Sequence, residues 1–447
     1  MPSSSSFFRV VSVALVCTSL VALAALAGCS EDRGSVSNNG EKSETTAVLT
    51  DLCSIPDLIG CAEASSISAQ VPTQVTKATG KPLVLGMINQ ENTPVGSFPE
   101  LSQGVQAAID FVNNQLGGVD GRPVELEVCN TKFSAEGSTS CAQQFVTEGV
   151  PAVLGGIDVF GNGIDLLAEN EIPFIGGIPV STQSMTASNS FQFSGGSWGA
   201  MVAFADYAAT ELKAKSVAIL YGDFGSVADG ANYGKQTLEK LGVENVQMVP
   251  YPILETDLGS AIQAAAAGNP DAIMLLTADT GCTAAFEGLA TVGLKAQAFY
   301  TGACAAPKIV DGVPTEDSEG AIFNVEGPIS RTNPDPDTNL YNAVIAQYGN
   351  GLDAIGAATV SFRAFMNLYV VLSELGADGI TADTVTSALR GKVDASSFMG
   401  HPYTCNGKQF KGLPAVCAPQ QMLGLMTDRQ LNQIGDWVDV GKIYGMG

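Results

Sequence analysis

The chain has 447 residues and a formal net charge of −24. So strong a negative charge would repel nucleic acid, and it leaves no basic patch for anionic lipid, so we predict no nucleic-acid partner. With 45% hydrophobic residues the chain can bury a sizeable core and is not disordered as a whole. Its length suggests two lobes rather than one core.

The first 28 residues are typical of a secretory signal. Arg9 precedes an apolar run, Val10 to Leu26, that ends in Leu26-Ala27-Gly28-Cys29 and has no basic stop-transfer flank. Leu-Ala-Gly-Cys resembles the lipobox of bacterial lipoproteins, which implies cleavage after Gly28 and lipid attachment to Cys29. A plain signal peptide with an incidental cysteine is the alternative. We therefore predict an extracytoplasmic protein that is anchored to the cell membrane as a lipoprotein.

Cysteine usage agrees with export. Of the ten cysteines, Cys17 lies in the signal and Cys29 is the lipidation site, which leaves an even number for disulfides. A metal site is less favoured, because there is no CxxC spacing and His401 is the only histidine. We predict no metal or other cofactor. Other pairings are possible, but pairing of near neighbours is the simplest, and it gives Cys53–Cys61, Cys129–Cys141, Cys282–Cys304 and Cys405–Cys417.

Residues 29–80 are polar and without periodicity, which predicts a tether. From Lys81 onward, short apolar strands alternate with amphipathic helices. The predicted strands are 82–88, 124–128, 152–155, 173–175, 216–220, 246–249, 272–276 and 297–300. The predicted helices are 98–116, 141–149, 164–170, 201–212, 233–241, 258–267, 283–292 and 340–348. This alternation predicts an α/β fold with two doubly wound parallel-sheet lobes.

The order and spacing of several segments resemble the type I periplasmic solute-binding proteins, the branched-chain amino acid (Leu/Ile/Val)-binding family of ABC transporters. The segments are 83–87, 104–113, 116–126, 153–156, 172–175, 218–220 and 293–295. The resemblance implies three crossovers, near Gly195–Gly199, Asn324–Ile329 and Pro419–Leu423. Lobe 1 would hold 81–196 and 328–420, and lobe 2 would hold 199–324 and 423–447. The lobes would close on a ligand by hinge motion.

The resemblance also implies a ligand site in the loops that follow the strands. In amino-acid binders of the family, lobe 1 hydroxyls hold the ligand carboxylate and a lobe 2 acid pairs the ammonium. Here Val159 and Val180 take the hydroxyl positions, beside Ser181, and Ala303 falls near the acidic position, although Asp223 or Asp279 could substitute. A less polar ligand is therefore as well supported as an amino acid. The implied ligand-binding residues are Gln90, Phe98, Asp158, Val159, Phe160, Pro179, Val180, Ser181, Trp198, Asp223, Phe224, Ala278, Asp279, Gly302 and Ala303.

We predict a binding protein, not an enzyme, that captures a small solute and presents it to an ABC permease. Two alternatives stay open. Gly195-Gly196-Ser197-Trp198-Gly199 matches the nucleophile elbow of serine hydrolases, and His401 follows later in the chain, but no buried apolar strand precedes the elbow. The second alternative is a ligand-sensing receptor domain of the same fold. The stretch 333–337 lacks the ligands and glycine spacing of a calcium loop, so we predict a turn that caps the helix 340–348.

Overall fold

The computed structural model describes residues 53–93, 96–253, 255–277, 279–325, 327 and 334–445, without the side chains of Asp279 and Thr280. The predicted signal peptide, the lipidation site Cys29, Ala278 and half of the predicted second crossover lie outside these residues. None of the helices in the described ranges is long and apolar enough to cross a membrane.

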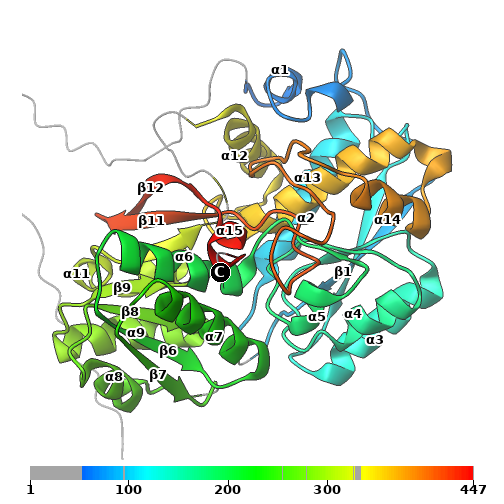
Figure 1. The fold of residues 1–447 in the computed structure, drawn as a ribbon. Coiled ribbons are helices and arrows are strands. Elements are labelled where there is room, and N and C mark those ends of the chain that lie inside the picture. The colour runs from blue at the N-terminus through cyan, green and yellow to red at the C-terminus, as the bar shows by residue number, and fades with distance from the viewer. Residues whose placement is uncertain are drawn as a thin grey trace, which may run out of the picture. The chain divides into compact units, whose positions relative to one another are not determined.

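Lobe 1, on the right in Figure 1, is built on a parallel sheet with the strand order β2-β1-β3-β4-β5. The strands are β1 (Leu83–Asn89), β2 (Val124–Asn130), β3 (Val153–Gly155), β4 (Phe174–Ile175) and β5 (Ser190–Phe191). The helices are α2 (Pro99–Gln115), α3 (Ala135–Glu148), α4 (Asn162–Glu169), α5 (Thr182–Thr186), α12 (Pro336–Tyr348), α13 (Ala358–Leu375), α14 (Ala382–Arg390) and a 3₁₀ turn, η3 (Ala377–Gly379).

Helices cover both faces of this sheet, as the continuous apolar run of β1 requires. Leu83, Leu85 and Met87 belong to the core shared with α2, α12 and α13. Ile88 belongs to the opposite core, which contains apolar residues of α3 and α4. Side chains alternate along a strand, so one short strand supplies both cores.

Lobe 2 is built on a seven-stranded sheet with the order β12-β11-β10-β9-β8-β6-β7. The strands are β6 (Ser216–Gly222), β7 (Asn245–Tyr251), β8 (Ala272–Leu276), β9 (Gln297–Tyr300), β10 (Ile322–Val325), β11 (Gln421–Thr427) and β12 (Gln430–Val438). The helices are α6 (Gly196–Thr210), α7 (Gly225–Lys240), α8 (Gly259–Ala266), α9 (Asp279–Val292), η2 (Gly302–Ala305), α10 (Pro307–Val310), α11 (Thr315–Ser318) and α15 (Val440–Gly445). β6 to β10 are joined by parallel pairs, and β11 and β12 form an antiparallel hairpin at the edge. The predicted α/β fold is confirmed.

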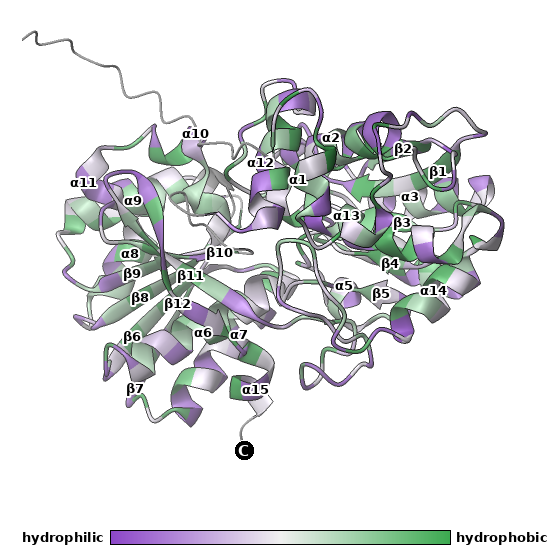
Figure 2. Cartoon of the chain, turned by 90° about the horizontal axis from the view of Figure 1, so that it is seen from above, coloured by the Kyte–Doolittle hydropathy of each residue, from purple (hydrophilic) through white to green (hydrophobic). Residues whose placement is uncertain are grey.

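The core of lobe 2 is also two-sided. Val217 and Ile219 of β6 join the core that contains α6 and α7, whereas Ala218 and Leu220 join the core that contains α8 and α9. Figure 2 shows the strands of this sheet mainly in the green of apolar residues, between helices whose colour varies from turn to turn. The sheets therefore hold the strand ends rigidly, and the loops that follow them are positioned by two packed cores.

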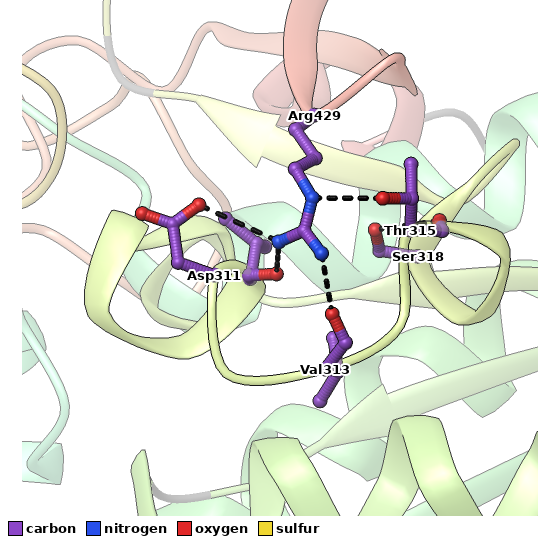
Figure 3. Close-up of polar contacts among 6 residues, drawn as sticks. Asp311, Val313, Thr315, Ser318 and Arg429 are labelled. Atoms are coloured by element: carbon purple, nitrogen blue, oxygen red, sulfur yellow. Dashed lines mark hydrogen bonds and ion pairs between the residues drawn. The ribbon is translucent and has the colours of Figure 1, made fainter. Parts of the chain in front are cut away.

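One arginine fixes the C-terminal hairpin to the body of lobe 2 (Figure 3). Arg429, in the β11–β12 turn, donates from Nε to Thr315 Oγ1 at 2.8 Å and from Nη2 to the Val313 carbonyl at 2.7 Å. Its Nη1 donates to the Val310 carbonyl and lies 3.4 Å from Asp311 Oδ1. The planar, many-donor guanidinium suits this task, because a single cation holds the stretch 310–315, from the end of α10 to the start of α11, at several points.

The predicted tether is wrong from Cys53 onward. This segment forms α1 (Ile59–Glu63) and a short 3₁₀ turn, η1 (Ser68–Gln70), and its Leu58 and Ile67 are buried in the lobe 1 core. Leu58 N donates to Gln115 Oε1 at 2.8 Å. A few apolar side chains are enough to pack this polar segment against lobe 1. The average composition of the segment does not reveal them.

All four predicted disulfides are confirmed. They join Cys53 to Cys61, Cys129 to Cys141, Cys282 to Cys304, and Cys405 to Cys417. Each closes a local loop within the described residues, so the bridges act as staples for loops rather than as links between distant elements.

The positions proposed for the crossovers contact one another where the structure describes them. Asn324 Nδ2 donates to Gln421 Oε1 at 3.3 Å. A Cβ added at Gly195 or at Gly199 would lie 3.3 Å from Gln421 Nε2. Glycine at these two positions therefore leaves room for the first connection to run beside the third.

Candidate ligand-binding site

Both lobes place loops at the carboxyl ends of parallel strands, where ligands bind in open α/β sheets. In lobe 1, β1, β3 and β4 end at Asn89, Gly155 and Ile175. In lobe 2, β6 and β9 end at Gly222 and Tyr300. The predicted ligand-binding residues follow these strand ends, with the exception of Ala278 and Asp279, which come after β8, and of Trp198, which lies in α6.

Three phenylalanines form a cluster that joins the two lobes. Phe160 of lobe 1 and Phe224 of lobe 2 meet edge to face, with ring centroids 5.4 Å apart. Phe133 of lobe 1 completes the cluster, at 5.3 Å from Phe160 and 5.9 Å from Phe224. All three side chains are only partly buried. The structure thus brings together two predicted residues and one that the sequence analysis missed.

Asp158 holds the loop after β3 in place. Its Oδ2 accepts a hydrogen bond from Ser138 Oγ at 2.6 Å, and its Oδ1 accepts one from Gly161 N at 3.2 Å. Burial raises the pKa of Asp158, and these hydrogen bonds oppose that shift in part. Since Gly163 N also donates to Ser138 Oγ, the carboxylate indirectly positions the start of α4 and the neighbouring Phe160.

Other predicted residues of lobe 1 are also engaged within the lobe. Ser181 Oγ caps α5 by accepting from Ser184 N at 3.2 Å. Val159 and Val180 are partly buried against the lobe 1 core, and Phe98 belongs to that core. Pro179 is buried, and its carbonyl oxygen lies 2.3 Å from where a Cβ at residue 196 would stand.

Gln90 is buried directly after β1. Its Nε2 donates to the Gly96 carbonyl at 3.2 Å and to Thr93 Oγ1 at 3.3 Å. Its Oε1 has no protein partner in the part of the chain that the structure describes. A buried acceptor without a partner carries an energetic cost, so this atom is available to a donor on a ligand.

The predicted residues of lobe 2 are more open. Asp223 is exposed, and its backbone N donates to the Tyr251 carbonyl at 2.7 Å. Gly302 N donates to Asn324 Oδ1 at 2.8 Å, and Ala303 is half-buried beside it. Thr301 Oγ1 and Ser226 Oγ are buried hydroxyl oxygens that lack protein partners among the described residues. Ala278 and the side chain of Asp279 lie outside the described part.

Trp198 is not brought to the phenylalanine cluster. It is buried in the core of lobe 2, where its ring stacks on Tyr233 at 5.3 Å and its Nε1 donates to the Ser226 carbonyl at 2.9 Å. Partial burial raises the pKa of Tyr233 to about 12. Trp198 therefore packs under the first turn of α7, inside lobe 2, and its ring face is covered by Tyr233 instead of facing a ligand.

The alternative catalytic pair is not assembled. Ser197 lies in the first turn of α6, whereas His401 Nδ1 lies 2.8 Å from the Pro402 carbonyl oxygen and its ring lies 5.9 Å from that of Trp437. Within the described part of the chain these two side chains share no hydrogen bond, which a serine nucleophile and its base would need. No cluster of metal-ligating side chains occurs among the residues that the structure describes.

Two α/β lobes whose loops face each other in this way form the architecture of the type I periplasmic binding proteins. A family model described as "Periplasmic binding protein" matches residues 82–412, and the chain belongs to this family. The resemblance inferred from the sequence is thereby confirmed.

Known proteins agree with this placement. The chain is 26% identical over 191 residues to Leu/Ile/Val-binding protein homolog 3 of Brucella melitensis. The aligned residues make up 41% of this chain and only 50% of that relative's length. It is similar to a leucine-binding protein of Thermotoga maritima, at 14% identity and a TM-score of 0.65, over 80% of this chain and 98% of the other. It is also similar to a solute-binding protein of R. palustris in complex with 4-hydroxybenzoate, at 18% identity and a TM-score of 0.64, over 80% of this chain and 98% of the other. At these identities the solved structures show the fold alone.

Proposed function

We propose that this chain is the solute-binding component of an ABC importer, that it works outside the cytoplasm on a lipid anchor at Cys29, and that it delivers a small, largely apolar solute to a permease. The family membership supports the role as a solute-binding component, and the sequence of the N-terminus supports export and the lipid anchor. The observation that carries the choice of solute is the phenylalanine cluster, which presents aromatic rings from both lobes at the predicted site.

The charges at the site favour the same kind of solute. An α-amino acid needs a free carboxylate for its ammonium group. Asp158 is the only acid among the predicted site residues of lobe 1, and its oxygens are occupied by Ser138 and Gly161. Asp223 of lobe 2 is exposed to solvent, where an ion pair contributes little, and the side chain of Asp279 lies outside the described residues. An aromatic body that carries a hydroxyl group and no ammonium group suits these surroundings better.

The polar end of such a solute has candidate partners. Gln90 Oε1 accepts, and the hydroxyls of Ser226 and Thr301 both donate and accept. Gln90 and Thr301 directly follow β1 and β9, and Ser226 lies in the first turn of α7, the helix that follows β6. A few neutral polar groups beside apolar rings are the usual composition of a small-molecule site.

Isothermal titration of the purified protein with 4-hydroxybenzoate, leucine and isoleucine tests the choice of solute. We expect 4-hydroxybenzoate to bind more tightly than either amino acid. Phe160→Ala should then weaken its binding about tenfold, or ~1.4 kcal/mol. Tyr207→Ala, a partly buried aromatic in lobe 2 that does not belong to the cluster, is the matched control and should stay within about twofold. Binding of leucine but not 4-hydroxybenzoate would contradict the proposal.

The anchor is tested separately in cells. Two acyl signals hold a protein on a membrane, whereas one is marginal, so Cys29→Ala should release the protein from the membrane fraction. Retention of the variant after a carbonate wash would contradict lipid anchoring. Delivery to a permease predicts that deleting the gene abolishes uptake of the labelled solute.

A further inference from the structure

A loop closed by a disulfide passes from lobe 1 to lobe 2 beside the crossovers. We call residues 405–417, bounded by the Cys405–Cys417 bridge, the strap. Cys405 and Cys417 are buried in the lobe 1 core, but Phe410, Leu413 and Val416 between them are buried in the lobe 2 core. The strap extends past residue 412, where the match to the family model ends.

The base of the strap is fixed to lobe 1 by backbone hydrogen bonds. Cys417 N donates to the Gln192 carbonyl at 2.8 Å, and Gln192 N donates to the Ala415 carbonyl at 2.9 Å. Ala415 N in turn donates to the carbonyl of Met185 in α5 at 3.1 Å. With the disulfide, these bonds leave the base little freedom to move relative to the lobe 1 sheet.

The tip of the strap is fixed to lobe 2 by apolar contact. Phe410 is 1% exposed, and its ring lies 5.9 Å from that of Tyr233 in α7 and 5.4 Å from that of Tyr444 in α15. Tyr233 and Tyr444 themselves lie 4.6 Å apart. Leu413 is also 1% exposed. A Cβ at Gly441 would stand 2.0 Å from the Gln409 carbonyl oxygen, so α15 and the strap are in close contact.

We propose that the strap is a fourth connection between the lobes, which restricts their opening and keeps the mouth of the site closed for more of the time. If the lobes open widely, Phe410 and Leu413 leave the lobe 2 core and expose apolar surface, or the base of the strap separates from Gln192 and loses backbone hydrogen bonds. Both changes cost free energy. The three chain crossovers permit rotation, whereas the strap penalises it. This effect does not depend on which solute binds.

The test uses a cross-link across the mouth as a reporter of closure. Thr182 Oγ1 of lobe 1 donates to Asp229 Oδ2 of lobe 2 at 3.4 Å, and both residues are exposed. The full-length protein with Thr182→Cys and Asp229→Cys is treated, without ligand, with copper–phenanthroline. The rate of disulfide formation, followed on non-reducing gels, then reports how often the mouth is closed.

We expect Phe410→Ala to slow this cross-linking roughly threefold or more, because the closed population falls. The matched control is Phe204→Ala, which removes a buried ring from the same lobe 2 core in α6 and leaves the ring contacts of the strap in place. The cross-linking rate of this control should stay within about 1.5-fold of the rate of the parent protein, because the ring contacts of the strap remain. Equal slowing by both variants would overturn the proposal, and so would an unchanged rate in a folded Phe410→Ala protein. If Phe410→Ala does not fold, Leu413→Ala carries the same expectation and the same failure.

Discussion

The loops of the two lobes that meet at the mouth are built differently. In lobe 1 the polar residues are engaged by their own lobe: Asp158 accepts from Ser138 and Gly161, and Ser181 caps α5. In lobe 2, Asp223 is exposed and Phe224 is half-buried on the lobe 1 rings. The difference suggests that lobe 1 supplies a preformed surface and that lobe 2 completes the site by contact. Preformed groups lower the cost of ordering on binding.

The largest expected effect of this contrast is on stability. Asp158→Ala leaves Ser138 Oγ and Gly161 N without their acceptor inside lobe 1, which should lower the free energy of unfolding by about 3 kcal/mol. Asp223→Ala, the corresponding change in lobe 2, removes an exposed carboxylate and should change it by less than ~0.5 kcal/mol. Urea unfolding measures both. Equal losses for the two variants would remove the distinction between the lobes.

Lobe 2 also contains fixed polar contacts, but at the C-terminal hairpin, where Arg429 donates several hydrogen bonds, rather than at the site loops. Arg429→Ala should destabilise the protein by about 2 kcal/mol, since three carbonyl or hydroxyl acceptors lose a charged donor. Arg429→Lys keeps the charge but not the fork of donors, and should recover less than half of the loss. Full recovery in thermal unfolding would mean that charge alone fixes the hairpin.

A smaller effect should appear in the pH dependence. Burial raises the pKa of Asp158 in the folded state, so the folded protein binds a proton at a pH where the unfolded chain does not. Stability from this group therefore rises as pH falls from neutral through the raised pKa toward the ordinary value of 3.8. Asp158→Asn cannot titrate, so the free energy of unfolding of the wild type should rise relative to that of this variant as the pH is lowered. A constant difference in urea unfolding between the two proteins would contradict the shift.

Much of the fold follows from the sequence, because apolar runs such as β1, β6 and β8 are buried on both faces by helices. The helix α13 escaped prediction since apolar residues occupy most of its circumference, which hides the period of an amphipathic helix. The strand β12 escaped because it is an edge strand with many polar side chains. Residues 53–80 were misjudged because their few buried side chains lie in a polar stretch.

The sequence assigns the candidate site to the loops that follow the strands, but it does not give the contacts between their side chains. Parallel strands end at one edge, so the sequence could indicate the loops that hold Phe160 and Phe224. It missed Phe133 because the loop after β2 was left out, and Lys132 and Phe133 both adopt a left-handed backbone there, with φ of 52°. It included Trp198 among the ligand-binding residues, whereas the structure buries this ring in the lobe 2 core against Tyr233; composition does not say which side of a helix faces the core.

Hydrogen–deuterium exchange with and without 4-hydroxybenzoate tests the central claim most directly, because the two lobes report separately. The account predicts that peptides covering residues 157–161 of lobe 1 and residues 222–226 of lobe 2 both gain protection. The negative control is a cleft of about 770 Å³ in lobe 2, lined by Lys213, Asp271 and Lys295 near the opposite ends of the strands, which should not change. Protection confined to one lobe, or to that cleft, would contradict a site between the two sets of loops.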